Sequence, residues 1–353
     1  MKNLIDDKLY IKDVERVATT KLKWEKLNNT SILITGATGM IASFLIDVIM
    51  YKNQKNDLKC KIYAISRNKE KINKRFSKYI DSEYFEIVIL DINDKIDLDI
   101  KKIDYVFHAA SNTHPVAYVT DPIGTITTNI MATYNLLNFS VDHNIKRFVF
   151  ASSVEIYGEN KGDCEKFSED YCGYIDCNSL RAGYPESKRA GEALCQAFIK
   201  QKNLDIVIPR FSRVFGPTML LSDTKALSQF IKNGINNEDI VLKSKGTQLY
   251  SYTYVADAVI GFLICLFNGK NGEAYNISSE KCNIMLKDLA KIIADNVNKK
   301  VIFELPDEVE QAGYSKATKA VLNNEKIKQI GFLPKYDMEE GLTHTITILK
   351  NIL

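Results

Sequence analysis

Six short apolar runs alternate with helix-like segments between residues 31 and 212. The runs are nearly continuous in apolar character, which is typical of parallel strands that are covered by helices on both faces. They lie at 31–36, 60–66, 85–92, 104–111, 147–153 and 205–212, and the main helix-like segments lie at 40–53, 67–80, 121–143 and 184–203. This order predicts an α/β fold with a doubly wound parallel sheet, in which ligands bind at the carboxyl ends of the strands.

The alternation fades after residue 215, which predicts a smaller α+β substrate-binding region at the C-terminal side. We expect helices at 223–234, 284–297 and 323–330 and strands at 239–243 and 300–304. The expected domains are an N-terminal helical extension at 1–28, a main domain at 29–215 with a returning segment at about 250–270, and a substrate-binding region at 216–249 and 271–353.

Charge and composition argue against two classes of partner. The 47 Lys and Arg are mixed with 44 Asp and Glu and form no basic block, so we expect no nucleic-acid binding. The longest apolar stretch, 259–267, is too short to span a membrane, and acids interrupt residues 1–10 where a signal peptide needs an apolar core. We therefore expect a soluble, cytoplasmic protein. Seven cysteines without a CxxC pair, and only four histidines, predict reduced thiols and no metal site.

A glycine-rich turn, "LITGATGMIA" (33–42), follows the first run and opens the first helix. Gly36 and Gly39 let the backbone turn tightly and approach a pyrophosphate, whose charge the free amides of the helix start stabilise. A purely structural turn is the alternative, but the position on the first of six strands predicts a Rossmann-type dinucleotide site. The expected contacts come from Gly36, Thr38, Gly39, Met40 and Ile41.

The second run ends in Ser66 and Arg67, where an acidic residue would bind the ribose hydroxyls of NAD. An arginine accommodates the 2′-phosphate of NADP, so this position favours NADP over NAD. The alternative is that Arg67 stacks on the adenine or faces solvent. Asp91 and Ile92, at the end of the third run, are expected to border the adenine unless they form a plain turn.

Tyr184 and Lys188, in "YPESK", lie on one face of a helix because they are one turn apart. A free tyrosine has a pKa near ~10, and a neighbouring ammonium lowers that pKa by favouring the phenolate. Tyr184 would then remove a hydroxyl proton while hydride leaves the same carbon, with Ser153 hydrogen-bonded to the same oxygen. The spacing also arises by chance at the start of surface helices. Its position after a dinucleotide turn and a strand ending in serine favours the catalytic interpretation.

Six motifs occur in a recognisable order: "TGATGMIA", "HAAS" (108–111), "DPIGTITTN" (121–129), "SSVEIYG", "YPESK" and "RVFGP" (213–217). From residue 30 onward the chain resembles the extended short-chain dehydrogenases/reductases, the NAD(P)-dependent epimerases, dehydratases and decarboxylases of nucleotide sugars. The resemblance implies a tightly held NAD or NADP, transient oxidation of a sugar at C4, chemistry on the ketone, and a homodimer packed through the Tyr184 helix. The further cofactor-binding positions that it implies are Ala109, Ala110, Ser111 and Asn129, together with Tyr184 and Lys188.

Glu155 follows Ser153 at the lip of the fifth run. A ketone at C4 makes the C5 hydrogen acidic and turns a C5 carboxylate into a β-keto acid, so a carboxylate there would serve as a base or proton shuttle. A solvated loop acid is the alternative. The chain is most similar to UDP-glucuronate decarboxylases, which share the glutamate, a downstream "EDY" and an arginine that corresponds to Arg181. The dTDP-glucose 4,6-dehydratases carry an Asp where this chain has Val154.

Three positions depart from the family pattern. An arginine that holds substrate phosphate is replaced by Tyr250, an asparagine by Arg213, and a late arginine by Lys319. We expect Arg213, helped by Lys225 or Lys319, to bind the anionic diphosphate, and pairing of Arg213 with Asp223 is the alternative. The expected substrate-binding residues are Thr113, Arg181, Arg213, Lys225, Tyr250 and Lys319.

These features predict an NAD(P)-dependent enzyme that modifies a nucleotide-diphosphate sugar through a 4-keto intermediate. Glu155 favours decarboxylation or dehydration. A 4-epimerase and a 4-ketoreductase or dehydrogenase are the enzymatic alternatives. A catalytically silent, cofactor-binding regulator is the alternative of another class.

Overall fold

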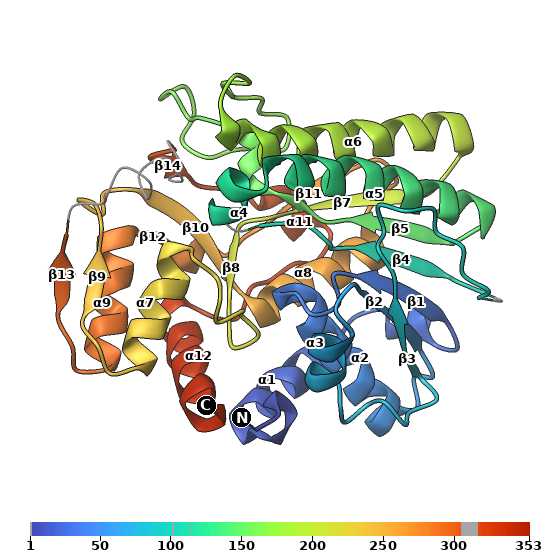
Figure 1. The fold of residues 1–353 in the computed structure, drawn as a ribbon, viewed down its shortest axis with the longest axis horizontal. Helices are drawn as coiled ribbons and strands as arrows, with labels where there is room; N and C mark the ends of the chain where they lie inside the picture. The colour runs from blue at the N-terminus through green and yellow to red at the C-terminus, as the bar shows by residue number, and fades with distance from the viewer. Residues whose placement is uncertain (1, 101, 114, 305–316) are drawn as a thin grey trace.

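A parallel sheet forms the centre of the protein, in the strand order β3–β2–β1–β4–β5–β7–β11 (Figure 1). The computed structural model describes residues 2–100, 102–113, 115–304 and 317–353. The strands are β1 Ser31–Thr35, β2 Lys61–Ser66, β3 Phe85–Ile89, β4 Tyr105–His108, β5 Arg147–Phe150, β7 Ile206–Phe211 and β11 Ala274–Ile277, with the short β6 Ser152–Ser153 beside β7. This confirms the doubly wound α/β fold. The strand order reverses between β1 and β4, so the ligand crevice is expected at their carboxyl ends.

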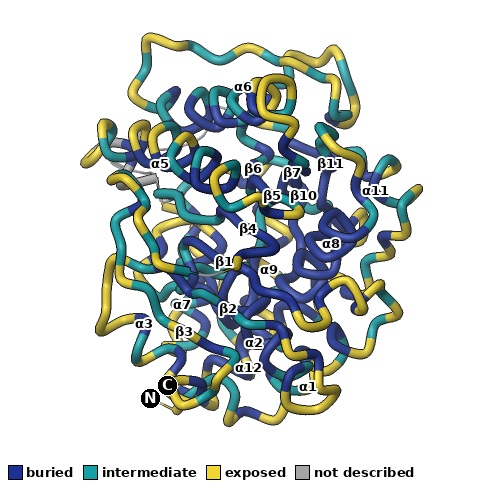
Figure 2. Tube along the Cα trace, turned by 90° about the vertical axis from the view of Figure 1, so that its right-hand side faces the viewer, coloured by how far each residue is buried: buried dark blue, intermediate teal, exposed yellow. Residues whose placement is uncertain are grey.

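Helices cover both faces of the sheet. The pair α5 (Pro122–Asp142) and α6 (Gly183–Lys202) lies side by side on one face, and α2 (Met40–Asn56) and α8 (Val255–Asn268) cover the other (Figure 1). Every residue of α8 from Val255 to Leu266 is buried, like most of the strands (Figure 2). Shorter helices, α3 (Lys69–Arg75) and α4 (Pro115–Thr120), follow β2 and β4. In the described part of the chain no helix is both long and apolar enough to cross a membrane.

The C-terminal region is built around two small sheets. One contains β8 Arg213–Phe215, β10 Leu249–Tyr254, β12 Asn283–Met285 and β14 Lys319–Ala320, and the other contains β9 Ile240–Leu242 and β13 Val301–Phe303. The helices are α7 Ala226–Ile235, α9 Leu286–Asn296, α11 Glu325–Gln329 and α12 Met338–Ile352. The returning segment begins as strand, since Tyr252 to Tyr254 pair with β8, and continues as α8.

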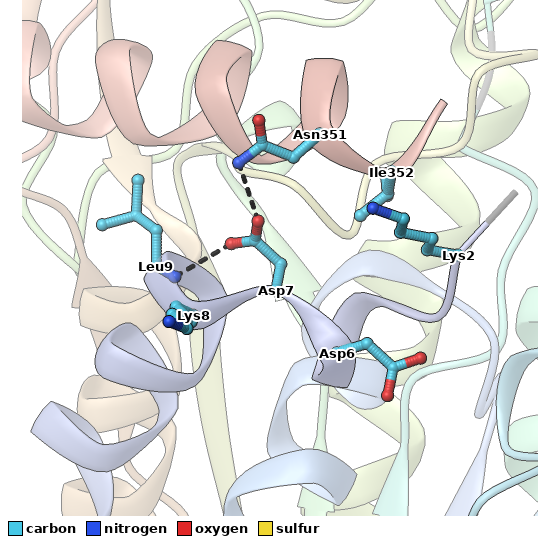
Figure 3. Close-up of a pocket in the computed structure, with 7 residues that line it drawn as sticks. All are labelled: Lys2, Asp6, Asp7, Lys8, Leu9, Asn351 and Ile352. Carbon is cyan, nitrogen blue, oxygen red and sulfur yellow. Dashed lines mark hydrogen bonds between the residues drawn. The ribbon is translucent and has the colours of Figure 1, made fainter.

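The N-terminal extension contains the α-helix α1 (Lys8–Ala18), which packs against α2, α8 and α12. The Asp7 side chain begins the helix by accepting hydrogen bonds from the amides of Leu9 and Tyr10, both at 2.9 Å. Asn351 of α12 donates to the same carboxylate at 2.8 Å (Figure 3). The hollow beside these residues is lined by none of the predicted site residues.

Asp13 connects the N-terminal extension to the C-terminal region through hydrogen bonds. Its carboxylate is buried and accepts hydrogen bonds from the hydroxyls of Tyr254 at 2.5 Å and Tyr336 at 2.7 Å. His344 Nδ1 lies 2.9 Å from the same carboxylate. Removing the carboxylate would leave buried hydroxyls without their partner, which is expensive in a protein interior.

We predict that Asp13→Ala lowers the free energy of unfolding by about 2–4 kcal/mol, because two buried hydroxyls lose their acceptor. Urea unfolding followed by circular dichroism measures the change. The control is Asp81→Ala at an exposed turn, where a change within about 0.5 kcal/mol is expected. Equal losses in the two variants would contradict the role given to Asp13.

Candidate active site

The glycine-rich turn brings β1 against the end of β4. Gly36 has φ +64°, and a Cβ on it would lie 2.8 Å from the backbone N and Cα of Ala110. Only glycine therefore suits this position. Helix α2 begins directly after Gly39, which provides no side-chain cap, so the amides of its first turn are available to an anion. Thr38, Met40 and Ile41 are half-buried around this turn. The arrangement fits the pyrophosphate of a dinucleotide.

Buried polar contacts fix the floor of the crevice. The amides of Ala109 and Ala110 donate to Thr35 Oγ1, both at 3.2 Å, and Thr35 Oγ1 lies 2.9 Å from His108 Nδ1. Burial, with a contribution from the Lys188 charge, lowers the pKa of His108 to about 3. His108 is therefore neutral near pH 7 and belongs to the framework.

A chain of hydrogen bonds connects α5 to the start of α6. Ser111 Oγ donates to Asn129 Oδ1 at 2.7 Å, Asn129 Nδ2 donates to Ser187 Oγ at 2.8 Å, and Ser187 Oγ donates to the carbonyl of Tyr184 at 2.9 Å. The predicted residues Ser111 and Asn129 thus support the turn that carries Tyr184. Ser187 was missed in the sequence, although it lies inside "YPESK".

At the other end of the cofactor crevice, Arg67 pairs with Asp91. The distance between Arg67 Nη1 and Asp91 Oδ2 is 3.6 Å, and the Arg67 side chain is 60% exposed. Ser66 accepts a hydrogen bond from the amide of Asn68 at 3.1 Å, and Ile92 is buried. The structure thus brings the predicted Arg67 and Asp91 together and leaves the arginine accessible to a ligand.

Tyr184 is buried beside Ser153. Burial raises the pKa of Tyr184 to about 12, although its hydrogen bond with Ser153 lowers it. Lys188 Nζ donates to the carbonyl of Ala151 at 2.9 Å, and burial lowers the pKa of Lys188 to about 8. Burial thus dominates the pKa of Tyr184 in the protein alone, and the lowering of that pKa by Lys188 stays a prediction.

Glu155 lies between two arginines. Arg181 Nη2 donates to Glu155 Oε2 at 2.7 Å, and Arg213 Nη2 donates to Glu155 Oε1 at 3.4 Å. Burial raises the pKa of Glu155, but the charges of Arg181 and Arg213 outweigh burial and hold that pKa below its ordinary value. Glu155 is thus an anion near neutral pH. The acid that Arg213 contacts is Glu155, whereas the alternative interpretation of the sequence paired Arg213 with Asp223.

Aromatic rings hold both guanidinium groups in place. Arg213 lies 3.6 Å from the ring centroid of Tyr250, and Arg181 lies 4.7 Å from that of Tyr118. The Tyr118 ring stacks on Tyr184 with 5.0 Å between the ring centroids, so these residues adjoin the Tyr184 phenol. We call Glu155, Arg181, Arg213, Tyr118 and Tyr250 the Glu155 cluster. No sequence motif indicated Tyr118, because α4 joins the site only through the tertiary fold.

The other predicted substrate residues differ in position. Lys225 Nζ lies 3.5 Å from Thr113 Oγ1, and its charge acts on Glu155, so both residues lie near the cluster. Lys319 pairs with Leu249, whereas Ala320 pairs with Tyr250. Because successive strand residues point to opposite faces, Lys319 lies on the face away from Tyr250. Lys319 acts instead on the thiol of Cys164, whose pKa is raised by burial and lowered by the Lys319 charge.

The pKa of Lys188 gives a prediction about stability. Its value of about 8, against an ordinary 10.5, means that the folded chain binds fewer protons than the unfolded chain between these two pH values. The buried ammonium therefore lowers the free energy of unfolding. This effect is complete below pH 8 and disappears as the pH rises toward 10.5. The free energy of unfolding of Lys188→Met, relative to that of the parent, should therefore be about 2–4 kcal/mol higher at pH 7 than at pH 10.5.

Denaturant unfolding at the two pH values measures this difference. The matched control is Lys202→Met at the exposed end of α6, for which the two pH values should give the same difference from the parent. A pH-independent effect of Lys188→Met would contradict the burial of a titrating ammonium.

Comparison with known proteins places the chain in a family. Residues 32–278 match the model of the NAD dependent epimerase/dehydratase family. Among curated proteins, UDP-glucuronic acid decarboxylase 3 from Arabidopsis thaliana is 29% identical over 89% of this chain and 87% of that protein. UDP-glucuronic acid decarboxylase 1 from Xenopus tropicalis is 28% identical over 95% of this chain and 77% of that protein.

Solved structures share the fold. A UDP-glucuronic acid 4-epimerase from Bacillus cereus has a TM-score of 0.78 at 22% identity, covering 92% of this chain and 100% of that one. A dTDP-glucose 4,6-dehydratase from Streptomyces venezuelae has a TM-score of 0.76 at 20% identity, covering 91% and 97%. With the family match spanning most of the sequence, the chain belongs to the NAD dependent epimerase/dehydratase family.

Proposed function

We propose that this protein is a nucleotide-sugar decarboxylase that works through a 4-keto sugar. The observation that carries the proposal is the Glu155 cluster beside Tyr184, because two guanidinium groups next to the reacting phenol suit a sugar that carries an acid group. The curated relatives, which are named as UDP-glucuronic acid decarboxylases, support the same reaction class.

The chain supplies the proton chemistry and the cofactor site. Tyr184 would take the proton of the C4 hydroxyl, and Ser153 would orient that oxygen. The Gly36–Gly39 turn would hold the pyrophosphate of NAD. Bound NAD would accept hydride from C4 and supply positive charge near the phenol. That charge is needed because the pKa of Tyr184 in the protein alone is about 12.

Decarboxylation suits the charge state of Glu155 better than dehydration does. A 4-keto sugar with a C5 carboxylate loses carbon dioxide when the C5–carboxyl bond breaks and its electron pair moves toward the ketone, and C5 then takes up a proton. Loss of a C6 hydroxyl needs a proton on the leaving oxygen as its bond breaks, whereas the C5–carboxyl bond breaks before C5 takes up a proton. The lowered pKa of Glu155 leaves its carboxylate without a proton to donate at neutral pH.

The direct test is incubation with UDP-glucuronate and NAD, followed by mass spectrometry. We expect a product lighter by one carbon dioxide, because the reduced cofactor would return its hydride to C4 after the carboxyl group has left. Unchanged mass with a new stereoisomer would indicate a 4-epimerase, loss of water a dehydratase, and a change of two hydrogens a dehydrogenase or ketoreductase. Any of these three outcomes, or no product, would contradict the decarboxylase proposal.

Tyr184→Phe should lower kcat by about 10³-fold, because it removes the group that takes the hydroxyl proton. Tyr174→Phe, at an exposed tyrosine, is the matched control and should keep parental activity. Full activity in Tyr184→Phe would overturn the assignment.

The nucleotide preference stays a prediction. Arg67 favours NADP, but its pairing with Asp91 weakens the attraction for a 2′-phosphate. Asp91→Asn should therefore improve the affinity for NADP relative to NAD by about 10-fold, as measured by calorimetry. Asp94→Asn, at an exposed neighbour, is the control. An unchanged ratio in Asp91→Asn would remove Arg67 and Asp91 from the cofactor site.

The homodimer and the cytoplasmic location also stay predictions. The outer side of α5 carries exposed apolar side chains, which support a dimer that buries this helix. They are Ile123, Ile126, Met131 and Tyr134.

A further inference from the structure

The two arginines of the Glu155 cluster have more hydrogen-bonding capacity than Glu155 uses. Each guanidinium gives one nitrogen to the carboxylate. Arg181 Nε, Arg181 Nη1 and Arg213 Nη1 are buried and have no hydrogen-bond partner in the part of the chain that the structure describes. Buried donors of this kind are expensive unless something pairs with them. Their presence beside Tyr184 therefore points to an acceptor that belongs to the ligand.

The two arginines contact Glu155 at different distances. The Arg181 contact at 2.7 Å has the length of a charge-assisted hydrogen bond, whereas the Arg213 contact at 3.4 Å is long. Arg213 lies against the Tyr250 ring at 3.6 Å, so its guanidinium is held mainly by the aromatic face. An incoming carboxylate can therefore pair with Arg213 without first breaking a strong bond.

The turn that contains Glu155 restricts how far its carboxylate can move. It lies in the short turn Val154–Tyr157, whose other three residues, Val154, Ile156 and Tyr157, are buried. The Glu155 amide donates to Ser153 Oγ at 3.2 Å. A ligand that takes over the arginines therefore leaves the Glu155 carboxylate in place next to Tyr184 and Ser153.

Resting on the proposed function, we propose that the acid group of the sugar and Glu155 compete for Arg181 and Arg213. Binding of an acidic sugar transfers guanidinium pairing from Glu155 to the substrate and thereby prepares Glu155 to take up a proton from solution, which C5 needs once carbon dioxide has left. Arg213 is the positioning residue of this exchange.

The exchange has a consequence for protons. Burial raises the pKa of Glu155, and Arg181 and Arg213 are the main charges that lower it. When a substrate carboxylate neutralises these charges, burial prevails and the complex binds more protons than the free protein does in mildly acidic solution. The other groups that act on Glu155 or face it are Lys225, Tyr118, Tyr184 and Tyr250, and the tyrosines are neutral in this pH range.

The experiment is titration calorimetry at about pH 6, where a buried carboxyl with a raised pKa takes up protons, in two buffers of different ionisation enthalpy. The Tyr184→Phe protein is loaded with NAD so that no turnover occurs, and it is titrated with UDP-glucuronate and, separately, with UDP-glucose. We expect uptake of several tenths of a proton with UDP-glucuronate and none with UDP-glucose. Introducing Glu155→Gln into the Tyr184→Phe protein should abolish the proton uptake that accompanies binding of UDP-glucuronate.

Arg213→Gln should weaken UDP-glucuronate binding by about 10-fold or more and UDP-glucose binding by less than about 3-fold. A loss that is equal for both sugars would mean that Arg213 binds the diphosphate, and it would overturn the inference. So would equal proton uptake for the two sugars, or uptake that survives Glu155→Gln. These results leave the proposed function intact. If the parent protein neither binds nor converts either nucleotide sugar, the proposed function fails and the inference falls with it.

Discussion

The ion pairs between Glu155 and the two arginines connect parts of the chain that are distant in sequence. Arg181 precedes α6, Arg213 lies on β8, and Glu155 follows β6. A carboxylate buried without such partners would be strongly unfavourable, so the pairs and the local fold stabilise each other. The same contacts set the charge beside Tyr184. One cluster therefore both joins these segments and sets the charge next to Tyr184.

Around this cluster the framework is rigid for identifiable reasons. The hydrogen bonds from Asn129 through Ser187 to Tyr184 fix the start of α6 relative to α5. The neutral His108 completes the bonding of Thr35, which in turn receives the amides at the end of β4. Buried polar networks that are fully paired specify one arrangement, because each alternative leaves a group unpaired. The phenol is thus held beside the crevice where the dinucleotide would lie.

The main sheet could be predicted because its strands are buried on both faces and therefore read as apolar runs. The glycine turn and "YPESK" were visible because backbone geometry and helical spacing restrict them to few residue types. Several elements were not predicted, β11 and α12 among them. Strand β11 has only four residues after a turn, and α12 follows a region without clear periodicity. The partners of Glu155 also could not be derived, since Tyr118, Arg181 and Arg213 meet only in the folded chain. Sequence spacing also does not report burial, which dominates the pKa of Tyr184 in the protein alone.

The central claim is that two arginines beside the reacting phenol receive an acid group of the sugar. A crystal structure of the Tyr184→Phe protein with NAD and UDP-glucuronate tests it most directly. The account predicts the sugar carboxylate within about 3 Å of nitrogens of Arg181 and Arg213, with the C4 oxygen next to Ser153. A carboxylate that points away from both arginines, with the diphosphate on Arg213 instead, would contradict it.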